Sequence, residues 1–208
     1  MYKAPYFKEN NREAVLAFMQ QYPFVVLTGC DREQRPVATH IPLLLEEKGD
    51  RLLLYGHIQR KTDHHLAYEH NPQVMAIYNG PHAYISSSWY NNPASVSTWN
   101  YMAVHAAGTL RFTDDAALLG LLTKTTAHFE RHNGSDALVE KMPEEYVART
   151  MKAIIGFEIE VTSLEAVFKL SQNRDATTYQ EIIHRLQTAG GESALVAAEM
   201  EKRKKDIF

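Results

Sequence analysis

The sequence predicts a mainly β protein of the α+β class, folded as a small β-barrel with helices at both ends. Short apolar runs bounded by Gly, Pro, Asn or Asp recur between residues 24 and 112, and one more follows at residue 154. Amphipathic helical patterns lie near both ends of the chain. Because the strands do not alternate regularly with long helices, a doubly wound parallel sheet is excluded.

The first part of the chain predicts one helix followed by a meander of strands. An asparagine at position 10 or 11 can cap a helix that carries apolar residues at helical spacing and ends at Pro23. Strands are then expected over residues 24–28, 36–45 and 52–57. Short strands joined by tight turns favour an antiparallel sheet or barrel.

The rest of the chain continues this pattern with longer helices. Further strands are expected over residues 74–78, 84–89, 99–112 and 154–161. Further helices are expected over residues 62–70 and 114–132, and in a tail at about 175–208. Gly80-Pro81 is expected to end a strand, because proline cannot donate to a sheet. A chain of 208 residues predicts one core, and therefore a single domain spanning residues 1–208.

Composition and charge restrict the class of protein. The formal net charge of −3 gives no global attraction to nucleic acid or to an anionic membrane. Cys30 is the only cysteine, which excludes a disulfide framework within the chain and fits a reducing compartment. The polar first eleven residues do not resemble a signal peptide, and no apolar run is long enough for a membrane span. We therefore expect a cytoplasmic protein.

A pair of cations, Arg60 and Lys61, lies between a predicted strand and a predicted helix, in a stretch that also contains His57. Thr62 can cap the helix, whose free N–H groups and dipole favour an anion. Arg60 can grip two phosphate oxygens in a fork, and Lys61 can add a point charge. The pair indicates a phosphate site, with a solvated surface pair as the alternative.

Two further stretches gather aromatic and hydrogen-bonding side chains. Residues 79–90 could line a pocket for a flat heterocycle, or could form an aromatic-rich strand packed on the core. In residues 97–105, Asn100 offers two donors and an acceptor, which suits the pyrimidine edge of a flavin. Core packing of Trp99 explains this second stretch equally well.

Metal and nucleic-acid sites have weaker support. His128 and His132 are four residues apart on a predicted helix, but the residues between them do not form the HExxH motif, so no metal site is expected. Walker, GxGxxG and GxSxG motifs are absent from the sequence. The basic run at residues 202–205 could contact DNA phosphates, or could simply end a helix whose dipole favours cations.

Five motifs carry a family resemblance. They occur in the order MYKAPYF, ATHIPLLL, GPHAYISSSWY, STWNYMAVHAAG and FKLSQNR. Together they resemble the PaiB-type FMN-binding proteins, a family known as negative transcriptional regulators of sporulation and protease genes. The resemblance covers nearly the whole chain and extends to the wider split-barrel flavoproteins, which include pyridoxamine 5′-phosphate oxidase.

The resemblance implies an FMN-binding split β-barrel that forms a homodimer, with two FMN sites at the interface. Arg60 and Lys61 fall where that superfamily binds the flavin phosphate, and residues 39–41 fall beside the isoalloxazine ring. The segment 169–174 falls where the partner chain reaches over the cofactor. The implied FMN contacts are Thr39, His40, Ile41, His57, Arg60, Lys61, Trp99, Asn100, Lys169 and Arg174.

The resemblance leaves the reaction open. It implies a transcriptional regulator that uses FMN as a ligand or a redox sensor, with DNA as a partner. The alternative is a flavin-dependent oxidoreductase acting on a small substrate, since in flavin enzymes the cofactor carries the chemistry and no protein motif is required. A haem- or metal-binding protein is indicated only by the number of histidines.

Overall fold

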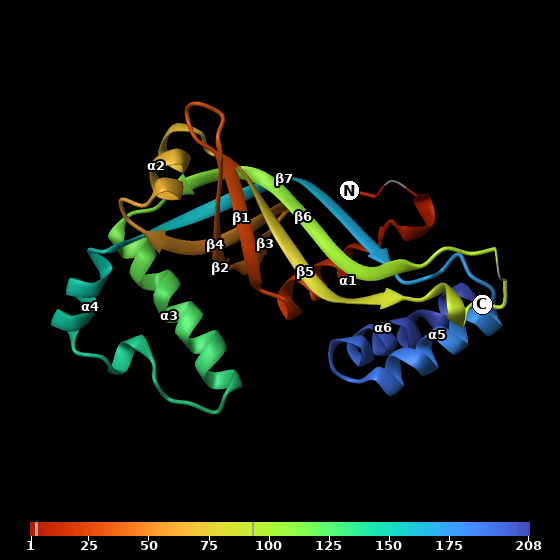
Figure 1. Ribbon diagram of the computed structural model, residues 1–208. Coiled ribbons are helices and arrows are strands. Elements are labelled where there is room, and N and C mark those ends of the chain that lie inside the picture. Colours follow the sequence, from red (N-terminus) through yellow and green to blue (C-terminus); the bar gives the residue numbers. More distant parts are fainter. Residues whose placement is uncertain (3, 93) are drawn as a thin grey trace. The chain divides into compact units, whose positions relative to one another are not determined.

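The computed structural model describes residues 1–2, 4–92 and 94–208 (Figure 1). The strands are β1 (Phe24–Cys30), β2 (Pro36–Pro42), β3 (Leu44–Lys48), β4 (Arg51–Gln59), β5 (Gln73–Ile85), β6 (Thr98–Phe112) and β7 (Ile154–Lys169). The α-helices are α1 (Arg12–Gln21), α2 (Asp63–His70), α3 (Asp115–His132), α4 (Glu144–Met151), α5 (Ala176–Ala189) and α6 (Gly191–Ile207). Short 3-10 helices occupy Pro5–Phe7, Ser87–Trp89 and Val139–Lys141.

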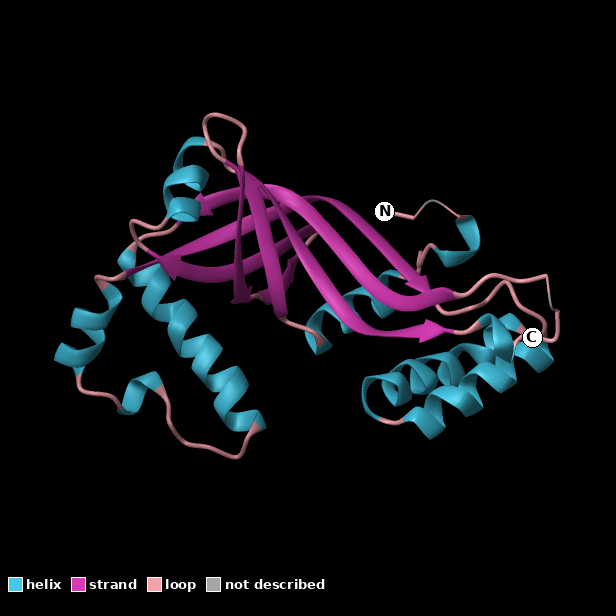
Figure 2. Cartoon of the chain, viewed as in Figure 1, coloured by secondary structure: helices cyan, strands magenta, loops and turns pink. Residues whose placement is uncertain are grey.

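Within the described residues, seven strands form one sheet in the order β2-β1-β5-β6-β7-β4-β3. Figure 2 shows these strands together with the helices. The strand pairs with an assigned register are antiparallel, namely β1 with β2 and β5, and β4 with β3 and β7. The antiparallel sheet predicted from the short strands is therefore confirmed, but these strands do not follow one another as a simple meander, because β5 lies beside β1 and β7 beside β4.

β2 and β3 form opposite edges of this sheet, although only Leu43 separates them along the chain. The single strand expected over residues 36–45 is therefore wrong, because the chain leaves one edge after Pro42 and enters the other at Leu44. The N–H of Leu43 donates to the carbonyl oxygen of Pro23 at 2.9 Å, and its side chain is buried. Since both edges meet at one residue, the sheet must curl into a half-barrel.

Gly56 on β4 provides the space that Leu43 occupies. A Cβ atom at Gly56 would lie 2.7 Å from Cδ2 of Leu43 and 2.7 Å from Cζ of Phe157, which is closer than real Cβ contacts. Phe157 on β7 is the register partner of Gly56. Any side chain at position 56 would displace these two buried neighbours. The close packing of Leu43 against the sheet therefore requires a glycine at this position.

Residues 23–78 and 106–164 form one of two compact units. In this unit the hydroxyl of Tyr68 on α2 donates to the carbonyl oxygen of Leu27 on β1 at 3.1 Å. Asp114 caps α3 by accepting from the N–H of Ala117 at 2.8 Å, so the predicted helix is confirmed. The helix α4 was not predicted, because it is short, exposed and has no side-chain cap.

Residues 1–22, 79–105 and 165–208 form the other unit. Its C-terminal part is helical as predicted, but it consists of two helices, α5 and α6, that lie side by side (Figure 1). Gly190 separates them with φ 71°, a conformation that favours glycine. The hydroxyl of Tyr179 on α5 donates to the carbonyl oxygen of Met200 on α6 at 2.9 Å. That both units belong to one domain stays a prediction.

Two predicted strand ends are wrong. β5 continues through Gly80-Pro81 to Ile85, where a break and a separate strand over residues 84–89 were expected. The register between β1 and β5 ends at Ile77. A proline at position 81 therefore breaks no hydrogen bond to β1, although it has no N–H to donate. β7 also continues past residue 161 to Lys169. β5, β6 and β7 therefore each contribute residues to both units.

Candidate functional site

The predicted cation pair lies in the turn between β4 and α2. Lys61 adopts a left-handed backbone conformation with φ 64°, and its N–H donates to Nδ1 of His65 at 3.3 Å. Thr62 caps α2, as predicted, by accepting from the N–H of His65 at 3.4 Å. The side chain of Lys61 is exposed and has no hydrogen-bond or ion-pair partner among the described residues. The turn therefore presents an uncompensated ammonium group.

Arg60 is held by the chain that enters β7. Its backbone N–H donates to the carbonyl oxygen of Ala153 at 2.9 Å, and its Nε donates to that of Ile154 at 2.8 Å. Its Nη2 lies 3.7 Å from Oδ1 of Asp115, a contact longer than a hydrogen bond. Because a guanidinium has five N–H donors, most of them stay available to an oxyanion.

This junction combines the two cations with two carboxylates, those of Asp63 and Asp115. The carboxylate of Asp63 accepts from the N–H of His64 at 2.8 Å and lies 3.0 Å from its ring Nδ1. These hydrogen bonds lower the pKa of Asp63, so it is ionised at neutral pH. The two carboxylates balance the formal charges of Arg60 and Lys61, but neither pairs with Lys61 among the described residues, and the Arg60 guanidinium keeps N–H donors that suit a phosphate.

His57 lies half-buried on β4, opposite Gly156 of β7. Burial lowers the pKa of His57 below its usual value. The ring is therefore neutral at pH 7 and can donate from one nitrogen while accepting at the other.

β2 carries three predicted flavin contacts at an edge of the sheet. Thr39 is half-buried, His40 is exposed and Ile41 is buried. The ring of His40 is stacked against that of Phe24, with 6.3 Å between the centroids. β2 pairs with β1 on one side and has no registered strand on the other among the described residues. An unpaired strand edge is a template for a second chain.

Trp99 and Asn100 begin β6 in the other unit and differ in exposure. Trp99 is 52% exposed, which excludes packing in the core, and its ring lies 5.8 Å from that of Tyr84. Asn100 is fully buried, and its Oδ1 accepts from the hydroxyl of Ser171 at 3.0 Å. Its Nδ2 lies 3.5 Å from Sδ of Met200. Asn100 therefore fixes the turn after β7, and Trp99 presents a ring to solvent.

Lys169 and Arg174 lie in the same unit and line a pocket of about 170 Å³. The sequence did not predict that the N-terminal aromatic residues Tyr2, Tyr6 and Phe7 would line it too. The signal was present in the MYKAPYF motif, but nothing in its spacing assigns those rings to a pocket. The structure thus divides the ten predicted contacts between its two units, with residues 39–61 in one and residues 99–174 in the other.

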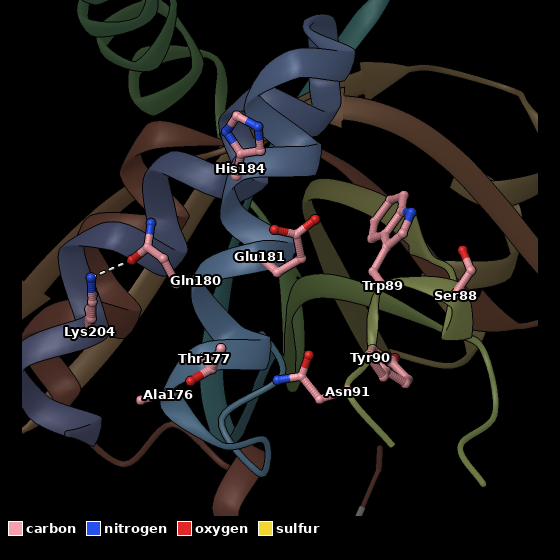
Figure 3. Close-up of a pocket in the computed structure, with 10 residues that line it drawn as sticks. All are labelled: Ser88, Trp89, Tyr90, Asn91, Ala176, Thr177, Gln180, Glu181, His184 and Lys204. Carbon is pink, nitrogen blue, oxygen red and sulfur yellow. Dashed lines mark hydrogen bonds between the residues drawn. The ribbon is translucent and has the colours of Figure 1, made fainter. Parts of the chain in front are cut away.

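A groove of about 830 Å³ runs beside α5 in this unit (Figure 3). Trp89 and Tyr90 line one part of it, so the end of the predicted aromatic stretch does face a pocket. Gln180 and His184 of α5 line another part. Lys204 of α6 reaches across to donate to Gln180.

The basic run at residues 202–205 is tied into its own unit. Arg203 pairs with Glu9 at 2.5 Å and lies over the ring of Phe168, 4.6 Å from its centroid. Lys202 donates to Glu199 on α6, and Lys204 donates to Gln180 on α5. In the described part of the chain, Lys205 alone of these four cations has no such partner. This run therefore acts mainly within the fold.

Neither a candidate metal site nor a candidate membrane-spanning helix occurs among the described residues. No group of three His, Cys, Asp or Glu side chains there could hold a metal ion, and the side chain of His132 lies outside the described part of the chain. None of the described helices is both long and apolar enough to cross a membrane.

A family model described as "Putative FMN-binding domain" matches residues 1–163. The chain belongs to this FMN-binding family. "Protease synthase and sporulation protein PAI 2" of Bacillus subtilis (strain 168) is 35% identical to it over 209 residues, covering 100% of both chains. The family predicted from the motifs is therefore confirmed.

Solved structures share the fold of this family member. The flavocytochrome Anf3 from Azotobacter vinelandii superposes with a TM-score of 0.57 at 15% identity, over 81% of this chain and 72% of that one. The FAD and heme binding protein from Mycobacterium smegmatis superposes with a TM-score of 0.57 at 18% identity, over 88% of this chain and 80% of that one. The predicted split-barrel fold is confirmed.

FMN is the cofactor of this family, and the predicted cofactor is thereby confirmed. The turn at Arg60 and Lys61 fits the phosphate of FMN, because both side chains keep donors that the described protein does not use. The matched segment ends at residue 163, so Lys169 and Arg174 lie beyond the family model.

Proposed function

We propose that the protein is an FMN-binding homodimer in which Arg60 and Lys61 bind the flavin phosphate. The observation that carries this proposal is the strand-to-helix turn, where an anchored guanidinium and a free ammonium lie next to the capped N-terminus of α2. Helix N-termini favour anions through their free N–H groups and dipole. Arg60 supplies the fork and Lys61 the point charge.

The isoalloxazine ring is proposed to lie along β2. Thr39, His40 and Ile41 offer a hydroxyl, an imidazole and an apolar side chain in succession, and the half-buried neutral ring of His57 adds a hydrogen-bonding group. The edge position of β2 supports the approach of a second chain.

The partner chain is proposed to contribute the other four residues, which are Trp99, Asn100, Lys169 and Arg174. An isologous dimer would then build two equal sites from both chains. Trp99 fits this role because its exposed ring can cover a flat heterocycle, whereas Asn100 would act through the Ser171 turn that it holds.

Two measurements test this proposal. Titration of the protein into FMN should quench flavin fluorescence saturably, at about one flavin per chain, and sedimentation at micromolar concentration should give a dimer. Linear, unsaturable quenching would refute the cofactor site. A monomer that still binds one FMN would refute only the shared interface.

The role of the dimer is proposed to be negative regulation of transcription in the cytoplasm, with FMN as ligand or redox sensor. Its support is the full-length relative named for protease synthase and sporulation. A gel-shift series across salt concentrations tests it, because direct DNA binding must weaken as salt rises. The engaged cations at residues 202–205 leave little free charge there for DNA.

A flavin-dependent oxidoreductase is the second candidate, favoured by the pocket at Lys169 and Arg174, which has room for a small substrate. Bound FMN supplies hydride or single-electron transfer, and the protein supplies binding and orientation. NAD(P)H-dependent bleaching of the flavin, followed by reoxidation with a small acceptor, would favour this candidate. Bleaching at only the rate of free FMN would count against it.

A further inference from the structure

We propose that the pocket at Lys169 and Arg174 binds a small oxyanion, the carboxylate or phosphate group of a ligand other than FMN. All of its lining residues belong to one unit of a single chain. Anion binding as such therefore does not depend on the dimer or on flavin. Its position beside the cofactor rests on the proposed function, in which this segment of the partner chain reaches over FMN.

Lys169 is a nearly buried cation whose donors are only partly used. Its side chain lies at the end of β7, and the residue is 8% exposed. Nζ donates to the hydroxyl of Thr98 and, at 2.6 Å, to the carbonyl oxygen of Trp99, and it lies 5.6 Å from the ring centroid of Phe7. An ammonium has three N–H donors, so one stays available for a ligand.

Arg174 adds a second cation to the same pocket. Its guanidinium lies over the ring of Tyr90, 4.2 Å from the centroid, and no side-chain hydrogen bond of Arg174 occurs among the described residues. The carboxylate of the next residue, Asp175, accepts from the N–H and the hydroxyl of Thr178 at 2.9 and 2.7 Å and forms no ion pair with Arg174 among the described residues.

The two cations thus share a pocket without a counter-ion. In the described chain, neither Lys169 nor Arg174 is paired with a carboxylate within 4 Å. Burial, together with the charge of Arg174, lowers the pKa of Lys169. Buried charges are unfavourable unless an opposite charge pairs with them. A bound oxyanion would supply that charge and accept from both side chains.

The turn that carries these cations is fixed before any ligand arrives. Ser171 adopts φ 62°, an unfavourable conformation for a residue other than glycine. Its hydroxyl donates to Asn100 at 3.0 Å, and its carbonyl oxygen accepts from the N–H of Arg174 at 3.0 Å. A rigid turn lowers the entropy lost on binding.

The size and lining of the pocket define the ligand class. A volume of about 170 Å³ is below that of a site for a whole drug-sized molecule. Tyr2 and Tyr6 contribute rings and hydroxyls at its mouth, and both residues are largely exposed. The pocket therefore suits a small organic acid or a phosphate monoester, bound through its oxyanion.

Calorimetric titration of the FMN-loaded protein tests this inference at constant ionic strength, with inorganic phosphate and benzoate as separate probes. At least one probe should bind saturably, and Lys169→Met and Arg174→Gln should each weaken it by about tenfold or more, since each removes a charge-assisted contact. Arg149→Gln is the matched control, because Arg149 also lies over a tyrosine ring, 5.6 Å from the Tyr146 centroid, but lines neither described pocket.

The possible outcomes distinguish the two classes of ligand from each other and from results that contradict the inference. Saturation by phosphate alone identifies a phosphate monoester, and saturation by benzoate alone identifies an organic acid. No saturation by either probe, or equal binding by all variants, overturns the inference. If Lys169→Met does not fold, the half-buried Arg174 carries the test. If the variants instead abolish the preference for FMN over riboflavin, this pocket holds the flavin phosphate, and both this inference and the assignment of Arg60 and Lys61 are wrong.

Discussion

Arg60 donates its Nε–H to the carbonyl oxygen of Ile154 at 2.8 Å, across 94 residues of sequence. This bond joins the turn after β4 to the first residue of β7. It fixes the guanidinium through one donor, and the terminal nitrogens keep N–H donors for a ligand, although Nη2 also lies 3.7 Å from Oδ1 of Asp115. The charge of Arg60 is therefore oriented before a phosphate arrives.

Changing Arg60 and Lys61 together to alanine should weaken FMN binding without affecting riboflavin. Each charge-assisted contact contributes roughly 1.5–3 kcal/mol, so affinity for FMN should fall by at least about tenfold per contact. Riboflavin lacks the phosphate, so its affinity should stay the same. Fluorescence titration with both flavins measures the difference.

The double variant Arg149→Ala, Lys152→Ala is the matched control, because it removes the same two kinds of charge from the exposed surface of the same unit. It should leave both affinities unchanged. Equal losses of FMN and riboflavin affinity in the test variant would mean that Arg60 and Lys61 do not hold the phosphate. No loss at all would mean that they are a solvated surface pair.

Gly56→Ala should destabilise the protein by about 1–3 kcal/mol, the usual cost of overpacking a core. The added methyl group would lie 2.7 Å from both Leu43 and Phe157, which are buried. Urea unfolding gives the free energy of unfolding. Gly120→Ala on α3 is the control, since nothing lies within 4 Å of the position that the added Cβ atom would occupy and alanine favours a helix. Equal stability of the two variants would contradict the contact.

His57 should make the protein less stable as pH falls below about 6.5, its ordinary pKa. Burial lowers the pKa of His57 in the folded protein, so between the folded and unfolded pKa values the unfolded chain binds the extra proton. Above pH 6.5 the ring is neutral in both states and contributes no pH dependence. His57→Gln should flatten this decline, by up to about 1.4 kcal/mol per pH unit for one proton.

Chemical unfolding at a series of pH values between 7.5 and 5 measures that slope. His184→Gln, at an exposed histidine of α5, is the control for losing a histidine. If the slope of His57→Gln equals that of the unaltered protein, His57 is not a source of the acid sensitivity.

In the C-terminal basic run, Arg203 and Lys205 should behave differently. Arg203→Ala should lower the free energy of unfolding, because it removes the pair with Glu9 and the contact with Phe168. Lys205→Ala should leave stability unchanged and weaken any binding to promoter DNA, measured by fluorescence anisotropy across salt concentrations. Undiminished DNA binding by the Lys205 variant would show that the run serves only the helix.

The sequence predicted most elements, because apolar periodicity reports which residues are buried. The helices at residues 62–70 and 114–132 are confirmed to within one or two residues. The failures lie where distant chain segments decide the structure. Pro42 and Leu43 read as part of one strand, yet they link two edges of the sheet. Pro81 reads as a break, yet the neighbouring strand ends before it.

The site was predicted less completely, since a sequence shows residue types but not their partners. Motif order identified the family and FMN. It could not show that Asn100 accepts a hydrogen bond from Ser171, or that Lys169 is buried without a counter-ion. Both facts depend on β6 and β7 lying side by side, which no local pattern encodes.

Leu43 also affects the order in which the fold assembles. β1 with β2, and β3 with β4, are hairpins that can form from local chain contacts. Leu43 alone links β2 of the first hairpin to β3 of the second. The two hairpins therefore cannot diffuse apart, and bringing them together costs almost no loop-closure entropy. The pairing of Leu53 with Glu160 instead requires β7 to arrive from far along the chain. The β4–β7 seam is therefore the step that we expect to limit the folding rate.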